Sequence, residues 1–193
     1  MPIRDWKKEI FTIPNLLSMF RLVLIPVYIY IYLNATEPRH YWLAGGILAV
    51  SCLTDLIDGK IARKFNMISN VGKVLDPIAD KMTQFSLIIC LSRVYPALNG
   101  LMVLFLVKEN FQLIAMLLNF RKGQVLDGAL LSGKISTTVL FVGLLVMVLF
   151  PDMSTTLVWV ITCVCGLFML IAFVDYVRAY YGKNKKLHNM EDM

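Results

Sequence analysis

The chain has 193 residues, of which 58% are hydrophobic and only 17% are charged, and its mean hydropathy is +0.68. A soluble domain carries about a quarter charged residues, so this composition excludes an ordinary soluble domain and a disordered chain and indicates a membrane protein. The formal net charge is +6, and the basic residues cluster at the ends of apolar runs, which favours contact with anionic lipid headgroups and no nucleic-acid partner.

The first twelve residues mix charged and apolar side chains ahead of the first long apolar run. Ile3, Trp6 and Ile10 recur at helical spacing between basic and acidic residues. This pattern predicts a short amphipathic helix over residues 1–12 that lies on the membrane surface.

Six apolar stretches follow, each long enough to cross a bilayer, which takes about 20 residues. Their unbroken apolar character does not fit the alternating pattern of a membrane β-barrel. The sequence therefore predicts an all-α fold, an integral membrane bundle of six transmembrane helices within a domain over residues 13–181, followed by a polar cytoplasmic tail over residues 182–193. The predicted helices cover residues 14–33, 41–63, 72–94, 97–120, 132–150 and 154–181.

Basic residues are divided unequally between the two ends of these spans. With the N-terminus inside, only Arg39 and Arg93 lie near the outer loops, and most other lysines and arginines lie at the inner ends. The positive-inside rule then predicts a multi-pass protein with both termini on the cytoplasmic side.

Four aspartates lie within the second and third predicted helices. Asp55 and Asp58 are three residues apart near the inner end of one helix, and Asp76 and Asp80 are four apart near the inner start of the next. Each spacing places two carboxylates on one helix face, and consecutive helices are expected to be antiparallel neighbours. The four carboxylates can then converge, and an all-oxygen cluster suits a hard divalent cation such as Mg²⁺.

Small and basic residues between the aspartates fit the same site. Gly59 and Ala62 lie on or beside the Asp55 face, where small side chains admit a ligand or a close helix. Arg63 follows and suits a phosphate. Any single aspartate is compatible with an ordinary helix-end charge, but the whole set favours a functional site because a carboxylate inside a span is costly.

The segment reads Asp55-x2-Asp58-Gly59-x2-Ala62-Arg63-x8-Gly72-x3-Asp76-x3-Asp80. It resembles in full the signature of the CDP-alcohol phosphatidyltransferase family, whose six-helix membrane fold agrees with the predicted spans. Two further stretches are similar to the bacterial phosphatidylglycerophosphate synthase branch of that family. These are Ile13-Pro14-Asn15-Leu16-Leu17 with Arg21 and Pro26, and Asp175-Tyr176.

The resemblance implies phospholipid biosynthesis at the plasma (inner) membrane, with phosphatidyl transferred from CDP-diacylglycerol to an alcohol and CMP released. It implies two divalent ions, Mg²⁺ or Mn²⁺, and a homodimer with its active site on the cytoplasmic side. Asp80 would act as general base on the acceptor hydroxyl. The implied metal ligands are Asp55, Asp58, Asp76 and Asp80, and the implied nucleotide-binding residues are Asp55, Gly59, Ala62, Arg63 and Gly72.

In the synthase branch the acceptor is glycerol 3-phosphate, an anion that needs cations near it. Lys108-Glu109 resembles an Arg-Glu pair of that branch, and residues 133–137 resemble its Gly-Lys-x-Lys-Thr segment, with Ser136 in place of the second lysine. An interpretation of the loop cations as positive-inside charges alone stays open. The candidate residues for the acceptor phosphate are Lys108, Arg121, Lys122, Lys134 and Arg178.

Two alternative functions remain. Within the family, the chain could be a cardiolipin synthase whose acceptor is phosphatidylglycerol. From a different class, intramembrane carboxylates could line the pathway of a divalent-cation or proton transporter. The position of all four aspartates at one end of the spans argues against a transporter, since the outer half of such a pathway would carry few charges.

Overall fold

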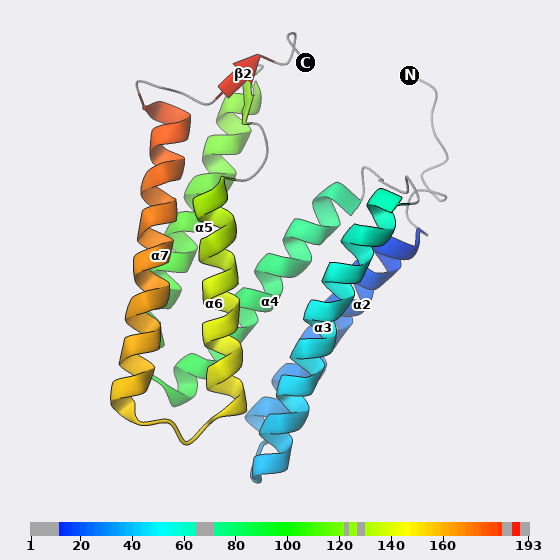
Figure 1. Cartoon of the computed structure of the whole chain (residues 1–193), viewed down its shortest axis with the longest axis vertical. Coiled ribbons are helices and arrows are strands. Elements are labelled where there is room, and N and C mark those ends of the chain that lie inside the picture. The colour runs from blue at the N-terminus through cyan, green and yellow to red at the C-terminus, as the bar shows by residue number, and fades with distance from the viewer. Residues whose placement is uncertain (1–11, 65–71, 122–123, 127–129, 183–186, 190–193) are drawn as a thin grey trace. The chain divides into compact units, whose positions relative to one another are not determined.

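The computed structural model describes residues 12–64, 72–121, 124–126, 130–182 and 187–189 (Figure 1). The predicted amphipathic helix lies almost wholly outside these residues. The described chain is built of six long helices, as the hydropathy pattern predicts, together with two short strands. The elements are α2 (Ile13–Leu33), α3 (Pro38–Lys64), α4 (Gly72–Val94), α5 (Leu98–Arg121), β1 (Gln124–Leu126), α6 (Leu131–Leu149), α7 (Thr155–Tyr181) and β2 (Leu187–Asn189).

Helix ends follow local chemistry. A proline occupies the first turn of α2, where its missing N–H leaves no hydrogen bond unmade. The Ser154 hydroxyl caps α7 by accepting a hydrogen bond from the Leu157 N–H at 3.3 Å. Helix α3 begins at Pro38, three residues earlier than predicted from the apolar run, because a proline fits the first helical turn.

Four of the helices are long and apolar enough to cross a membrane, over Asn15–Leu33, Leu98–Arg121, Leu131–Leu149 and Thr155–Tyr181. Helices α3 and α4 carry the aspartates and several basic residues, which lower their hydropathy. With 27 and 23 residues they are still about 40 and 35 Å long, more than the roughly 30 Å of a hydrocarbon core. The chain is thus an all-α membrane protein, and spanning by α3 and α4 stays a prediction.

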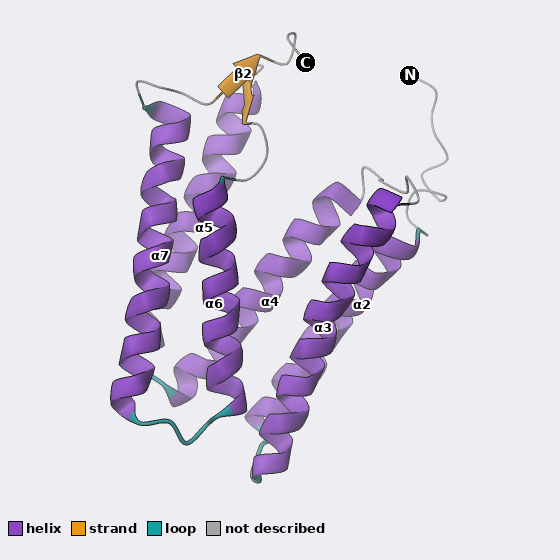
Figure 2. Ribbon diagram, viewed as in Figure 1, coloured by secondary structure: helices purple, strands orange, loops and turns teal. Residues whose placement is uncertain are grey.

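The two strands are not part of the predicted architecture. β1 follows α5, and β2 lies in the segment assigned to the polar tail, where it pairs antiparallel with β1 and places Val125 opposite His188 (Figure 2). A three-residue strand is too short for an alternating pattern to stand out in a sequence, so this pairing had no recognisable signal.

The chain divides into two compact units, each described by itself. The first contains Met1–Cys90 with Val148–Pro151, and the second contains Leu91–Met147 with Asp152–Met193. In the first, α2 packs along α3, and the Tyr32 ring meets Tyr41 edge-on at 5.6 Å. In the second, α5 packs along α7 around Ala115 and Tyr176.

Candidate functional site

The two predicted aspartate pairs lie at the C-terminal end of α3 and at the N-terminal end of α4, the next helix along the chain. Asp55 and Asp58 belong to the last turns of α3, which ends at Lys64, and Asp76 and Asp80 belong to the first turns of α4. The side chains of residues 55–77 lie outside the described set, and this includes the nucleotide-binding candidates Gly59, Ala62, Arg63 and Gly72. Convergence of the four carboxylates therefore stays a prediction.

Asp80 is held by a buried arginine from another helix. The Arg21 guanidinium Nη1 donates to the Asp80 Oδ1 at 2.6 Å, joining α2 to α4 within the first unit. The Arg21 side chain is 3% exposed and the Asp80 side chain is 44% exposed. A cation buried in an apolar span is costly unless an anion partners it, so this pair compensates the charge of Arg21 and fixes the Asp80 carboxylate.

Arg21 continues a buried polar face on α2. Asn15 and Ser18 precede it at three-residue spacing, and all three side chains are buried, whereas Leu16 and Phe20 on another face are exposed. The sequence interpretation used Asn15 and Arg21 only as marks of family resemblance and did not assign them to the site. The available signal was the i, i+3, i+6 recurrence of polar residues in an otherwise apolar span.

The chemistry of the predicted donor set fits a hard divalent cation. The ligands proposed from the sequence are all carboxylate oxygens, supplied by two helices of one unit. Asp80 is the member of this set whose side chain is described, and its partial exposure leaves it accessible to a ligand. Among the described side chains no group of three or more His, Cys, Asp or Glu forms a metal site.

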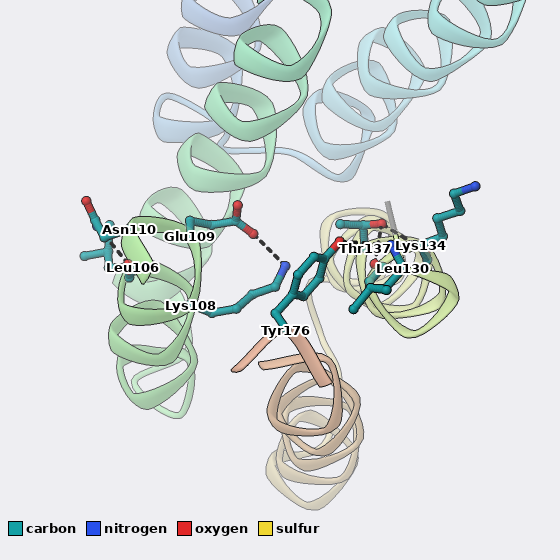
Figure 3. Close-up of polar contacts among 9 residues, drawn as sticks. Leu106, Lys108, Glu109, Asn110, Leu130, Lys134, Thr137 and Tyr176 are labelled. Carbon is teal, nitrogen blue, oxygen red and sulfur yellow. Dashed lines mark hydrogen bonds and ion pairs between the residues drawn. The ribbon is translucent and has the colours of Figure 1, made fainter. Parts of the chain in front are cut away.

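The acceptor candidates are not brought into one cluster. Lys108 is buried in α5 and its Nζ donates to the Glu109 Oε1 at 2.7 Å (Figure 3). Arg121, Lys134 and Arg178 are exposed, and Figure 3 shows the Lys134 side chain extending away from Tyr176. Lys122 lies outside the described residues.

Depth also separates these cations. Arg121 ends α5, Lys134 lies in the first turn of α6, and Arg178 lies in the last turn of α7, and these helix ends lie together in the second unit (Figure 1). Lys108 is about 20 Å from Arg121 along α5. The described candidates therefore do not form a single phosphate site. Lys108 is buried and ion-paired, and the other three cations lie on the surface.

Three relatives match different shares of the chain. A cardiolipin synthase (CMP-forming)/mitochondrial hydrolase fusion protein of Schizosaccharomyces pombe is 44% identical over 91 residues, which is 46% of this chain and 14% of that protein. A cardiolipin synthase (CMP-forming) of Streptomyces coelicolor is 38% identical over 86 residues, 44% of this chain and 40% of that protein. The chain thus spans less than half the length of these two relatives. A probable phosphatidylglycerophosphate synthase of Mycobacterium tuberculosis is 31% identical over 175 residues, 89% of this chain and 82% of that protein.

The family model described as CDP-alcohol phosphatidyltransferase matches residues 11–174. The match includes all of α2 to α6, most of α7 and the four aspartates. This extent confirms the resemblance seen in the aspartate motif and agrees with the relative that matches nearly the whole chain. The chain belongs to the CDP-alcohol phosphatidyltransferase family.

Proposed function

We propose that this protein transfers phosphatidyl from CDP-diacylglycerol to glycerol 3-phosphate, giving phosphatidylglycerophosphate and CMP in phospholipid biosynthesis. The observation that carries the proposal is the family match over residues 11–174, within which the aspartate motif lies. The choice of acceptor is supported by the Mycobacterium tuberculosis relative, which is named a probable phosphatidylglycerophosphate synthase and is similar over 89% of this chain.

Asp55, Asp58 and Asp76 would hold the metal, Mg²⁺ or Mn²⁺, as two ions. When bound, the metal neutralises negative charge on the pyrophosphate of CDP-diacylglycerol. Arg63 would bind a phosphate of the nucleotide, and small side chains would leave room for that nucleotide. The residues proposed for the latter task are Gly59, Ala62 and Gly72.

Asp80 would accept the proton of the acceptor hydroxyl. The hydroxyl oxygen then bonds to the phosphorus that carries diacylglycerol, and the bond from this phosphorus to the pyrophosphate bridging oxygen breaks, so that CMP leaves with the electron pair. Because Arg21 already donates to the Asp80 Oδ1, a metal at that oxygen would compete with a buried guanidinium. This contact favours the base over a fourth metal ligand as the main role of Asp80.

The acceptor phosphate would bind to cations of the second unit. Lys134, Arg121 and Arg178 are exposed at neighbouring helix ends, where a soluble anion can reach them. Lys122 is proposed from the sequence alone. Lys108 is matched by Glu109, so it adds little net positive charge to this site.

The cellular arrangement follows from the same reasoning. We propose a plasma-membrane enzyme with both termini and the active site in the cytoplasm, because basic residues collect at the inner ends of the spans. Residues 13–181 would form the enzymatic domain between an amphipathic N-terminal helix and a polar tail. A homodimer is proposed from the family resemblance.

Cardiolipin synthase activity is the second candidate. It is favoured by the higher identity, 44% and 38%, of two cardiolipin synthases that match about half of this chain. Its acceptor would be the lipid phosphatidylglycerol. Family membership does not favour the transporter alternative.

The decisive experiment supplies purified protein with CDP-diacylglycerol, Mg²⁺ and either glycerol 3-phosphate or phosphatidylglycerol, and measures CMP release. We expect release with glycerol 3-phosphate and its loss in excess EDTA. Release with phosphatidylglycerol alone would replace the proposed acceptor, and undiminished turnover in EDTA would contradict the metal assignment.

A further inference from the structure

Tyr176 lies where three helices of the second unit meet. Its side chain is 5% exposed and packs with Ala115 of α5, and its ring stacks on Tyr180 with centroids 6.4 Å apart. The Tyr176 hydroxyl accepts a hydrogen bond from the Leu130 N–H at 3.3 Å, immediately before α6. Figure 3 shows the Tyr176 ring between Lys108 of α5 and Leu130.

Gly133 allows this ring to lie against the first turn of α6. A Cβ at position 133 would be 2.6 Å from the Tyr176 Oη and 2.8 Å from its Cε2, so a larger residue would displace the ring or the helix. The next residue is Lys134, whose N–H donates to the Leu130 carbonyl at 3.1 Å. The contact with Tyr176 therefore fixes the turn that carries Lys134.

The Tyr176 ring also reaches α5. It packs with Ala115, which lies about two turns after Lys108 on the same helix. Lys108 and Glu109 form their 2.7 Å ion pair beside this point. Tyr176 thus links α5, through the packing of its ring, to the turn of α6 that bears Lys134, through its hydroxyl and the contact at Gly133.

We propose that Tyr176 is a positioning residue for the acceptor, since it holds the turn of α6 that carries Lys134 against α5. This inference rests on the proposed function, in which Lys134 serves the acceptor phosphate. Tyr176 acts through the backbone of α6, so its loss weakens acceptor binding and leaves the use of CDP-diacylglycerol unchanged.

The test compares Tyr176→Phe with Tyr180→Phe in the full chain. Both variants lose a buried hydroxyl, but in the described part of the chain that of Tyr180 makes no side-chain hydrogen bond to α6. We expect Tyr176→Phe to raise the KM for glycerol 3-phosphate roughly fivefold, the worth of one hydrogen bond, with the KM for CDP-diacylglycerol and kcat within twofold. Tyr180→Phe should match the wild type.

A double-mutant comparison separates positioning from general loosening of the bundle. Lys134→Ala should raise the acceptor KM, and adding Tyr176→Phe to it should raise the KM little further, because the residue being positioned is gone. Fully multiplicative effects of the two changes would overturn the proposal. An equal rise in the KM values of both substrates in Tyr176→Phe would overturn it as well.

Hydrogen–deuterium exchange gives a readout independent of activity. The Leu130 amide should exchange faster in Tyr176→Phe than in wild type or Tyr180→Phe, since its acceptor oxygen is removed. Unchanged exchange would show that the contact is not made in the membrane and would overturn the inference. If wild type releases CMP only with phosphatidylglycerol, the proposed acceptor is wrong, and an unchanged KM for phosphatidylglycerol in Tyr176→Phe would then overturn the role of Tyr176.

Discussion

At the scale of single residues, the contact between Arg21 and Asp80 gives the aspartate motif a described structural partner. The motif on α3 and α4 could be recognised from spacing alone, because carboxylates are rare and costly in apolar helices. The partner on α2 could not, because which of several helices supplies a buried cation depends on tertiary packing. The polar residues at positions 15, 18 and 21 predict that this face of α2 is buried, but they do not predict that Asp80 pairs with Arg21.

Asp80→Asn tests the base. The substitution keeps size and one oxygen but removes the basic carboxylate, so kcat should fall at least about a hundredfold. Affinity for CDP-diacylglycerol should survive better than in Asp55→Asn or Asp58→Asn. The measurements are CMP release and nucleotide-lipid binding on all three variants, and normal turnover of Asp80→Asn would remove it from the mechanism.

Arg21→Met tests whether the arginine acts through Asp80. The change leaves the Asp80 carboxylate without its 2.6 Å partner, and we expect kcat to fall about tenfold or more, the worth of a charged hydrogen bond. In an Asp80→Asn background the same change should add little. Arg39→Met is the matched control, because Arg39 pairs with Glu37 on the surface, where an ion pair contributes little. Equal losses in the two arginine variants would point to a general effect of charge.

At the scale of elements, helix positions were predictable within about three residues, whereas the contacts between helices were not. Apolar runs and prolines mark the ends of a span regardless of what it packs against. Gly143 in α6 is an example. From the sequence, a glycine indicates only that another helix can pack closely against it, and not which helix does so. The structure places the Cys165 thiol and Ile161 against it, so α6 and α7 touch at this glycine.

Gly143→Ala and Gly100→Ala should therefore change stability in opposite directions. A Cβ at position 143 would be 2.8 Å from the Cys165 Sγ, so alanine there should lower the melting temperature. Gly100 faces open space in α5, and alanine there should stabilise by about 0.5–1 kcal/mol through helix propensity. Thermal unfolding in detergent measures both, and adding Cys165→Ala to Gly143→Ala should recover part of the loss. A shift of the same sign in both single variants would contradict this packing.

At the scale of the whole molecule, the number of spans decides on which side of the membrane the aspartates lie. With six spans, the connection between α3 and α4 is cytoplasmic, and with only the four most apolar helices crossing it would be outside. We expect the six-span arrangement because α3 and α4 are long enough to cross the bilayer. The end of α3 and the start of α4 are also rich in basic residues, which favours the cytoplasmic side.

Lys64→Cys, placed in a background without the four native cysteines, distinguishes these topologies. A membrane-impermeant maleimide added to intact cells should leave this cysteine unlabelled and should label it after permeabilisation. An Asn34→Cys variant, at the outer end of α2, should be labelled in intact cells and serves as the control. Labelling of Lys64→Cys from outside would support four spans.

The length of α3 has a further consequence for the lipid environment. At 27 residues it is about 10 Å longer than a hydrocarbon core is thick, so if its first turn meets the outer boundary, Asp58 lies at the inner boundary and Asp55 lies about 5 Å inside the hydrocarbon. A thicker bilayer would draw these carboxylates deeper into hydrocarbon unless the helix changes its tilt. Turnover should then decline as the acyl chains of the surrounding lipid lengthen, which would make membrane thickness itself a regulator of headgroup synthesis.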